Sequence, residues 1–590
     1  MEPNEIFAFG TFELDLRTGE LRKRGVKLKL QPQPIALLSL LVRHAGCLVA
    51  QEDLRRALWA DDTFVDFEKG LGMAIWKLRA ALGDTADNPR FIETLPRKGY
   101  RFIAPVQRIG NTTAGSARTM IAVLPFEDLG NTKADPYLVD GLTEELITQL
   151  GRLNPQRLGV IARASAIRYR APRISIRAIA EELRVRYVLT GSIRCTSKRL
   201  RITAHLVDTS DHANVWAQSY DRLVEDVVAL QIDLAQEIAG ALSIELMPDG
   251  QALVERTRTR SVEGYEYYLQ GRYHWNQRTP ESTKRALEYF QKSTAADPTY
   301  ALSFAGLADC YAVLGFYGDF APGQAFGRAK EYAAHAIRLD PELAEPHSSL
   351  AFCLLQYDWD WPAAERQHLE AIRLNPNCAP AYHWYGLTLT QVGLFTDARL
   401  ALEQALRLDP FSVAIRAHVG RLSYFSGDYD AAMKHLREAM ALDPGYVPSR
   451  YFLGMTLVHD GDNTAALALF EELVAVQEQP ILLSGLAYVQ GRSRQRTAAR
   501  ATIERLKSLE SRTRVPPYFV ALAYAGLGDS REAMRWLDEA LREKFGWMLY
   551  IKMEPAFDSV RADPEYRQEF LRLSDRTQSL NASPAEGPVS

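Results

Sequence analysis

A helical segment that ends in Asp-Pro or Asn-Pro recurs along the second half of this 590-residue chain. Its prolines are Pro298, Pro341, Pro376, Pro410 and Pro444. The last three intervals are 35, 34 and 34 residues, and an insertion around residues 316–323 would explain the longer first interval. Self-similarity at a fixed period is the signature of stacked supersecondary units, so this stretch is constrained to a repeat architecture.

Small residues recur in phase within each period. A small residue within a helix lets two antiparallel helices approach closely, a glycine supplies the turn between them, and proline ends the second helix. The residues Gly386, Gly393, Ala398 and Ala405 recur as Gly420, Gly427, Ala432 and Ala439. This pattern resembles the tetratricopeptide repeat, with clear units over residues 261–478 and degenerate ones to residue 573. We expect an all-α superhelix over residues 261–575, with an ordinary helical bundle as the alternative.

Residues 1–106 follow a different pattern. FAFGTFELDLRTGELRKRGVKLKL alternates apolar and polar residues and predicts a small antiparallel sheet. Helical stretches follow at residues 34–44, 51–59 and 67–82, and FIETLPRKGYRFIAPV predicts a closing hairpin. Residues 107–118 are polar and small, which predicts a linker.

A sheet, three helices and a C-terminal hairpin is the element order of a winged helix-turn-helix. The third helix, KGLGMAIWKLRAALGD, and the hairpin, PRFIETLPRKGYRF, resemble the OmpR/PhoB-type DNA-binding effector domain. At 100° per residue, Leu71, Ile75, Leu78 and Leu82 form one stripe, which we expect to be buried. The resemblance implies that the opposite face enters the major groove. The DNA-contacting residues that follow from it are Lys69, Met73, Trp76, Lys77, Arg79, Arg97, Lys98 and Tyr100.

These residues suit different parts of a DNA contact. Lysines and arginines fix the register through phosphates, and Arg97 and Lys98 at the wing tip are placed to reach phosphates or the neighbouring minor groove. Met73 suits a thymine methyl group, whereas Trp76 also suits packing on a neighbouring domain. An ordinary solvated or docking surface is the alternative for this face.

Residues 119–228 predict a small α/β domain. Strands are expected at MIAVLPF and LGVIA, helices over residues 137–153 and 176–183, and then three strands in a meander. VLTGSIR, RITAHLVD and VWAQSYD resemble the α/β domain of TolB-like proteins, for which we expect a coupling role. A ligand site at Gly191-Ser192 is the alternative. A helix over residues 224–246 is predicted, residues 229–260 are assigned as a connecting helix, and residues 576–590 as a disordered tail.

Charge is unevenly distributed along the chain. Residues 1–108 hold 17 Lys+Arg and 14 Asp+Glu, a net charge of +3, in a chain whose net charge is -3. A surplus of this size does not favour strong DNA binding by one monomeric module.

Several classes of protein are disfavoured. Five dispersed cysteines without a C-x-x-C pair argue against a disulfide framework or a zinc site. No phosphate-binding loop, nucleophile elbow or metalloprotease motif occurs, so we predict no enzyme, no catalytic residue, no cofactor and no metal. No signal peptide and no apolar stretch of about 20 residues is found, which predicts a cytoplasmic protein without a membrane partner.

A superhelix of repeats offers a concave groove lined by the first helix of each unit. The repeat phase places five residues there as a candidate partner site: His383, Arg421, Tyr424, Tyr451 and His459. That these residues only pack helices is equally favoured.

The chain is therefore predicted to be multidomain: a winged helix-turn-helix (α+β), a small α/β domain and an all-α tetratricopeptide-repeat superhelix. This layout resembles CadC-like regulators without their transmembrane helix, and HilA-like regulators. We expect a transcription regulator that binds promoter DNA and senses or recruits a protein or peptide partner, or a second copy of itself, through the repeats. The alternative is an interaction scaffold whose winged helix docks on protein.

Overall fold

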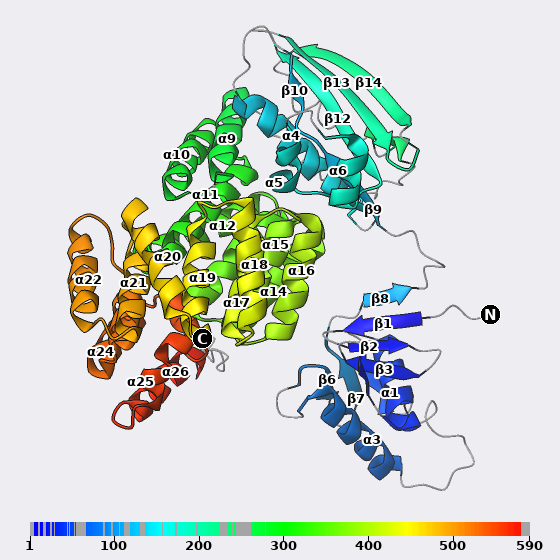
Figure 1. Cartoon of the computed structure of the whole chain (residues 1–590). Coiled ribbons are helices and arrows are strands. Elements are labelled where there is room, and N and C mark those ends of the chain that lie inside the picture. Colours follow the sequence, from blue (N-terminus) through cyan, green and yellow to red (C-terminus); the bar gives the residue numbers. More distant parts are fainter. Residues whose placement is uncertain are drawn as a thin grey trace. The chain divides into compact units, whose positions relative to one another are not determined.

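A computed structural model of the chain divides into two compact units, Met1–Ala117 and Arg118–Ser590 (Figure 1). Each unit is described by itself. The structure describes residues 5–9, 12–15, 19–23, 26–28, 30–43, 45, 48–51, 54, 67–85, 89–95, 98–104, 107–110, 118–129, 136–155, 157–170, 174–195, 199–211, 213–223, 234–235, 237–238, 240–242, 261–277 and 279–579.

The first unit contains two antiparallel sheets, with the strand orders β4-β3-β2-β1-β8 and β5-β7-β6. Its described elements are β1 (Glu5–Phe9), β2 (Phe12–Asp15), β3 (Glu20–Lys23), β4 (Val26–Lys27), α1 (Pro32–Arg43), β5 (Leu48–Ala50), α3 (Phe67–Leu82), β6 (Ile92–Leu95), β7 (Gly99–Phe102) and β8 (Gln107–Gly110). Residues 107–110, the first four of the predicted linker, instead form the strand β8. It pairs with β1, with Ile109 opposite Ile6, and so satisfies an edge that would otherwise be unpaired.

Four phenylalanines join the two ends of the first unit. Phe9 and Phe12 come from the N-terminal sheet, and Phe91 and Phe102 from the C-terminal hairpin. The Phe9 and Phe102 ring centres lie 5.0 Å apart at 79°, an edge-to-face arrangement that adds about 0.5–1.5 kcal/mol to the burial of the rings. The hairpin is thereby anchored to the N-terminal sheet. The helix predicted over residues 51–59 lies mostly outside the described residues.

The second unit begins with a six-stranded sheet of order β11-β9-β12-β13-β14, with β10 beside β12. Its elements are β9 (Thr119–Val123), β10 (Glu127–Asp128), α4 (Pro136–Leu153), β11 (Leu158–Val160), α5 (Arg163–Ala166), η1 (Ile167–Tyr169), α6 (Ile176–Leu183), β12 (Tyr187–Cys195), β13 (Arg199–Asp208) and β14 (Asn214–Leu223). β11, β9 and β12 are parallel, and β12, β13 and β14 form the predicted antiparallel meander.

Successive residues of β9 point to opposite faces of this sheet. Ile121 and Val123 join the apolar cluster that contains Leu150 of α4, and Ala122 joins the cluster that contains Ile179 of α6. Helices therefore cover both faces of the parallel part, as the crossover connections of parallel strands require. The helix predicted over residues 224–246 is described only in part.

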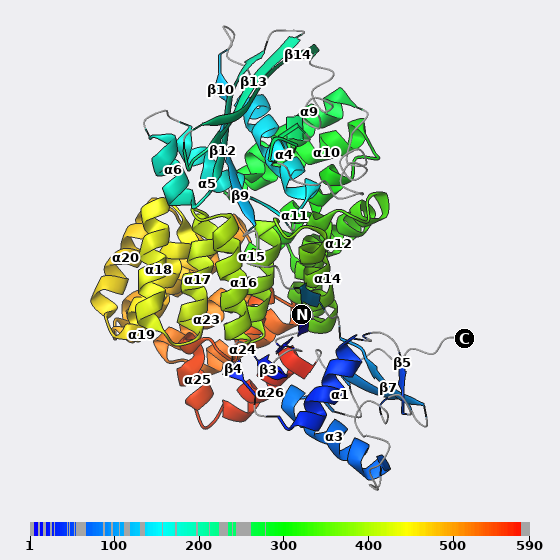
Figure 2. The ribbon, with the colours of Figure 1, turned by 90° about the vertical axis from the view of Figure 1, so that its right-hand side faces the viewer.

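Antiparallel helix pairs follow, as the repeat pattern predicts. They are α9 (Val262–Trp275), α10 (Pro280–Ala296), α11 (Ala301–Tyr317), α12 (Pro322–Leu339), α13 (Ala344–Cys353) with η3 (Leu354–Asp358), α14 (Trp361–Leu374), α15 (Ala379–Gln391), α16 (Phe395–Leu408), α17 (Val413–Phe425), α18 (Tyr429–Leu442), α19 (Val447–Asp460), α20 (Asn463–Val476), α21 (Pro480–Arg492), α22 (Arg496–Ser508) with η4 (Leu509–Ser511), α23 (Pro517–Leu527) and α24 (Ser530–Arg542). In two views, the sheet domain lies beside the first of these helices (Figures 1 and 2).

The phased small residues act as predicted. A Cβ added at Gly386 would lie 2.7 Å from the Leu402 side chain of the paired helix, so only glycine allows this approach. Gly393 has φ 78° and Gly427 has φ 79°, the left-handed conformation that a helix-ending turn requires.

Two units depart from the 34-residue period. α11 and α12 have 17 and 18 residues, against 13 and 14 in α15 and α16. The insertion predicted around residues 316–323 is therefore not an added loop, because it lengthens both helices by about one turn. In the next unit, the 35-residue interval contains the π-helical turn Leu354–Asp358, and such a turn takes up one residue more than an α-helical turn.

The chain then enters the interior of the repeat array through a stretch that we call the C-terminal segment, Phe545–Phe557. It contains η5 (Gly546–Tyr550) and η6 (Pro555–Phe557), and α25 (Asp558–Ala562) and α26 (Arg567–Ser579) follow it. The Trp547 ring contacts rings of α11, α19 and α23, with centres 6.1, 6.2 and 5.2 Å away at Phe316, Phe452 and Phe519. Because these helices lie far apart in the sequence, the array closes around its own C-terminal segment.

Candidate functional site

α3 is held in the first unit by the stripe that the sequence predicts. Leu71, Ile75, Leu78 and Leu82 are buried in the cluster that also contains side chains of α1. The opposite face is exposed: Met73 keeps 54% and Trp76 65% of its surface. Large exposed apolar side chains on one helix face mark an interaction surface more often than scattered ones do.

Polar contacts fix α3 against the β6–β7 hairpin. The Arg79 guanidinium donates to the Ile92 carbonyl oxygen at 2.7 Å and to Thr94 Oγ1 at 2.9 Å. The buried Asp84 carboxylate, just after α3, accepts from the backbone N–H groups of Arg90 and Ile92 at 2.6 and 2.9 Å. Arg79 thus positions the hairpin, and its predicted contact with DNA would compete with these bonds. Asp84 was not predicted, and an acidic residue directly after a helix is too common a pattern to reveal it.

The hairpin turn requires a glycine. Gly99 has φ 148°, and a Cβ there would lie 2.0 Å from the Val49 carbonyl oxygen of β5. The start of β7 therefore lies close against the neighbouring strand β5. Lys98 beside it is exposed, which leaves its ammonium group accessible for a phosphate.

The remaining residues predicted to contact DNA differ in their exposure and in their contacts. Lys77 donates to Gln31 Oε1 at 2.7 Å and is partly exposed. Tyr100 packs against the core of the unit, and burial raises the pKa of its hydroxyl. The backbone of Lys69 belongs to α3, but its side chain, and the whole of Arg97, lie outside the described residues.

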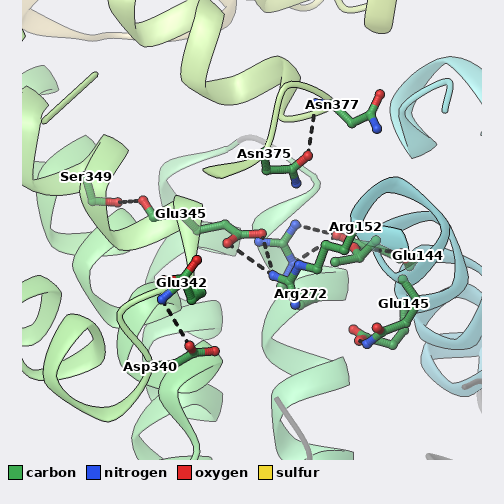
Figure 3. A network of polar contacts seen from close by, with 12 residues as sticks. Glu144, Glu145, Arg152, Arg272, Asp340, Glu342, Glu345, Ser349, Asn375 and Asn377 are labelled. Atoms are coloured by element: carbon green, nitrogen blue, oxygen red, sulfur yellow. Dashed lines mark hydrogen bonds and ion pairs between the residues drawn. The ribbon is translucent and has the colours of Figure 1, made fainter. Parts of the chain in front are cut away.

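In the second unit, a buried charge network joins α4 to the repeat array (Figure 3). Arg152 of α4 donates to Glu345 of α13 at 3.1 Å, and Arg272 of α9 donates to Glu144 of α4 at 2.9 Å. Burial would raise the pKa of Glu144, but Arg272 and Arg163 outweigh it and hold that pKa below its usual range. Breaking one partner of a buried pair costs about 3–5 kcal/mol, so this network favours a single orientation of α4 on the array.

The Asn-Pro and Asp-Pro loops of two repeats also bind the sheet domain. Asn377 donates from its side-chain amide to the Leu158 carbonyl oxygen at 2.9 Å, and its Oδ1 accepts from the Val160 N–H at 3.3 Å. Asp409 accepts from the Ser165 hydroxyl at 2.5 Å. The loops that reveal the repeat in the sequence therefore also dock the α/β domain, which supports its predicted coupling role.

Three of the five predicted groove residues face the C-terminal segment. Arg421 keeps only 2% of its surface, and its guanidinium carbon lies 4.6 and 4.4 Å from the ring centres of Trp547 and Tyr550. Tyr424 donates to Glu554 at 2.5 Å. Tyr451 is buried with its ring centre 6.4 Å from that of Trp547. The inner face is thus covered by the chain itself, from a segment that the sequence assigns to the degenerate end of the array.

The two predicted groove histidines pack between repeats. His383 of α15 is within hydrogen-bond distance of His418 of α17, and burial keeps the pKa of His418 well below its ordinary value. His459 lies among the Tyr424, Tyr429 and Tyr488 rings. Burial and Arg492 lower the pKa of His459 to about 4.

Among the described residues we find neither a membrane span nor a metal centre. No helix there has the length and apolar character needed to cross a membrane. No cluster of three or more His, Cys, Asp or Glu side chains there is arranged to hold a metal ion.

Comparisons with known families define the class of this chain. "Transcriptional regulatory protein, C terminal" matches residues 25–102, and "HilA/YgeH-like transcriptional regulator, second domain" matches residues 117–239. Tetratricopeptide-repeat families match residues 379–412 and 426–487. The chain thus carries an OmpR/PhoB-type DNA-binding domain, a HilA-like region and tetratricopeptide repeats. The resemblance to TolB-like proteins stays a prediction.

Two relatives match the chain to different extents. The transcriptional regulator HilA of Salmonella typhi is 24% identical over 435 residues, 73% of this chain and 75% of that protein. A putative adenylate cyclase 3 of Rhizobium meliloti is 32% identical over 244 residues. That match covers 40% of each protein, so the chain spans less than half of this relative. With these matches, the chain is a transcriptional regulator with a protein-interaction region.

Two solved structures are similar to parts of the chain. A thermophilic tetratricopeptide-repeat protein of Thermus thermophilus is 20% identical, with a TM-score of 0.29, and covers 33% of this chain and 99% of its own. The DNA-binding domain of RstA from Klebsiella pneumoniae, solved with the RstA box, is 27% identical with a TM-score of 0.15 and covers 17% of this chain and 96% of its own.

Proposed function

We propose that this regulator acts in the cytoplasm and binds double-stranded promoter DNA through the exposed face of α3 and the tip of the β6–β7 hairpin. The observation that carries the proposal is the way α3 is held: its apolar stripe is buried and its C-terminal end is bonded to the hairpin, while Met73 and Trp76 stay exposed. A helix fixed in this way presents its side chains to a groove without losing much conformational freedom on binding.

The available cations set the expected strength of binding. Arg79 is engaged within the unit, which leaves Lys69, Lys77, Arg97 and Lys98 as candidate phosphate contacts. Each contact contributes a slope of about -0.9 to the dependence of log affinity on log salt. We therefore expect weak binding by one copy and a total slope of no more than about -4.

A charge-matched pair of variants tests the proposal. The quadruple substitution of Lys69, Lys77, Arg97 and Lys98 to alanine should abolish most binding to the chain's own promoter region and flatten the salt slope. The control replaces Lys292, Lys434, Arg437 and Arg531 of the array by alanine. Those side chains are exposed, and the net charge changes by the same amount. Equal affinity and slope in both variants would show that the α3 face does not bind DNA.

We further propose that the array binds a protein or peptide partner, in line with its tetratricopeptide repeats. A partner that reaches Arg421, Tyr424 and Tyr451 must displace the C-terminal segment, because that segment covers them.

A synthetic peptide of residues 545–557 tests whether the inner face can bind a peptide once the C-terminal segment is displaced. It should bind the full-length variant W547A/Y550A and not the parent chain, and titration calorimetry measures both. Absence of binding to the variant would place any partner site elsewhere on the array.

A protein-docking role for α3 is the second candidate, because Trp76 keeps 65% of its surface and tryptophan is a frequent anchor of protein interfaces. Absence of DNA binding at low salt would favour it, and steep salt dependence would favour DNA.

We also infer that the chain is not an enzyme, since the relative matched over three quarters of its length is a transcriptional regulator. The relative that is a putative adenylate cyclase matches over 40% of its length. Formation of cyclic AMP from ATP by the purified chain would contradict the inference.

A further inference from the structure

The two edges of the six-stranded sheet differ in the partners of their backbone groups. At the β11 edge, Asn377 of the array satisfies backbone groups of Leu158 and Val160. At the other edge, β14 pairs with β13 alone among the described residues, and it forms the outer margin of the sheet (Figures 1 and 2). An edge strand carries a row of backbone N–H and C=O groups that are free to pair with another strand.

β14 has only part of the protection that is usual for an exposed edge. Its ten residues, NVWAQSYDRL, include neither proline nor lysine, two residues that commonly hinder edge pairing. Nine of its ten residues are exposed or partly exposed, and Tyr220 alone is buried. A bulge interrupts the β13–β14 pairing between Asn214 and Trp216, so the strand is regular from Trp216 to Leu223 and Val215 lies at the end of its free edge.

The sequence of β14 is complementary to itself about Ser219. In an antiparallel pair with a two-fold axis at Ser219, residue i of one copy meets residue j of the other and the reverse. Val215 then meets Leu223 of the second copy at both ends, and these side chains keep 44% and 46% of their surface. Trp216 meets Arg222, a cation–π pair, and no like charges stand opposite each other. An axis at Gln218 would instead place Val215 against Asp221.

We propose that β14 is a self-association edge, to which a second copy of this chain adds its own β14 in antiparallel orientation about Ser219. One strand pair buries less than the roughly 1,200–2,000 Å² of a standard stable interface, so the dimer is weak and depends on concentration. Self-association goes beyond the proposed DNA binding. Combined with it, a dimer brings two α3 faces together and raises the affinity by effective concentration.

Light scattering of the full chain without DNA tests the proposal. The parent chain should rise from its monomer mass of 66.3 kDa towards twice that value between about 1 and 100 µM, a range typical of a small interface. V215K/L223K should weaken the dimer by at least about 100-fold, because lysines then stand opposite each other at both ends. The control L400K/V476K changes two exposed apolar residues of the array in the same way and should leave the dimer intact.

Cysteine crosslinking tests the axis. Residues directly opposite across antiparallel strands have Cβ atoms about 4.5–5.5 Å apart, close to disulfide geometry. S219C should form a covalent dimer under mild oxidation faster than Q218C and faster than the parent with its five cysteines.

A parent chain that stays monomeric to 100 µM, a dimer that survives V215K/L223K, or faster crosslinking of Q218C would each overturn the proposal. DNA is absent from these experiments, so loss of DNA binding in the quadruple variant leaves their outcome unchanged, and the two proposals fail separately.

Discussion

The outer face of α3 was predicted from a family resemblance and the inner face of the repeat array from the repeat phase, and the two faces have opposite exposure in the structure. Both faces combine basic and aromatic residues opposite or beside a buried stripe. On α3, Trp76 keeps 65% of its surface, whereas Arg421 in the array keeps 2%. The periodicity of a helix identifies its faces, but a segment more than a hundred residues away decides whether a face remains exposed.

The two faces therefore have different energetics. Trp76 is free to gain contacts with a partner and contributes little to folding. Trp547 already has its contacts, with Phe316, Phe452 and Phe519 around it. Substitutions on the two faces should therefore differ in their effects on stability and on DNA affinity.

The largest difference is expected between two tryptophan substitutions. W547A should destabilise the array by about 3–5 kcal/mol, because a large buried ring is removed from a closed interior. W76A should change stability by less than about 0.5 kcal/mol, since its ring is exposed. Urea unfolding followed by the helical circular dichroism signal measures both. Similar costs for the two would mean that the C-terminal segment does not fill the array in solution. The effects on DNA affinity should be reversed, so that W76A weakens DNA binding more than W547A does.

A second contrast lies within the first unit, between two glycines. G99A should cost about 2 kcal/mol or more, since a Cβ would lie 2.0 Å from the Val49 carbonyl oxygen and the conformation is strained. G72A on α3 should instead stabilise by about 0.5–1 kcal/mol, because alanine is the better helix former and nothing lies within 4 Å of its added Cβ. Thermal unfolding of each variant checks the pair, and stabilisation by G99A would contradict the hairpin geometry.

A third expectation concerns pH and the buried histidines of the array. Burial lowers the pKa of His368 to about 3, against an ordinary value near 6.5. Between these values the unfolded chain takes up a proton that the folded chain does not. Stability should therefore fall as the pH falls below about 6.5, by up to about 1.4 kcal/mol per pH unit for each such histidine.

The measurement is urea unfolding at pH 7 and pH 5. H368Q should have a smaller pH dependence than the parent, because Gln does not titrate, and comparison with the parent removes the contribution of the carboxylates. H335Q, at a partly exposed position on α12, is the control. An unchanged dependence in H368Q would mean that His368 is accessible to protons in the folded array.

The smallest effect is expected at the hairpin tip. K98A should reduce the salt slope of DNA binding by about 0.9 and weaken binding equally for all sequences, as loss of one phosphate contact does. K292A, an exposed lysine of the array, should leave the slope unchanged. A change in sequence preference on K98A would indicate a base contact instead.

Most of the architecture could be predicted because the local periodicity of the sequence determines it. The stripe of α3 and the phased glycines Gly386 and Gly393 determine which residues are buried and where helices turn. The roles of Arg79 and Asp84 could not be predicted, because they depend on the distance between the end of α3 and the hairpin. The cover over Arg421 was missed because the C-terminal segment was assigned to the degenerate repeats, whereas it forms short 3₁₀ turns that pack inside the array.

The position of the C-terminal segment also changes how the repeat array is expected to fold. In a simple solenoid each repeat contacts only its neighbours, so folding can spread from any point and stability is nearly a sum over repeats. Here Trp547 contacts residues of α11, α19 and α23 at once. These long-range contacts should make the array unfold in one cooperative transition. During synthesis, its interior can reach the native packing only after residue 557 has left the ribosome.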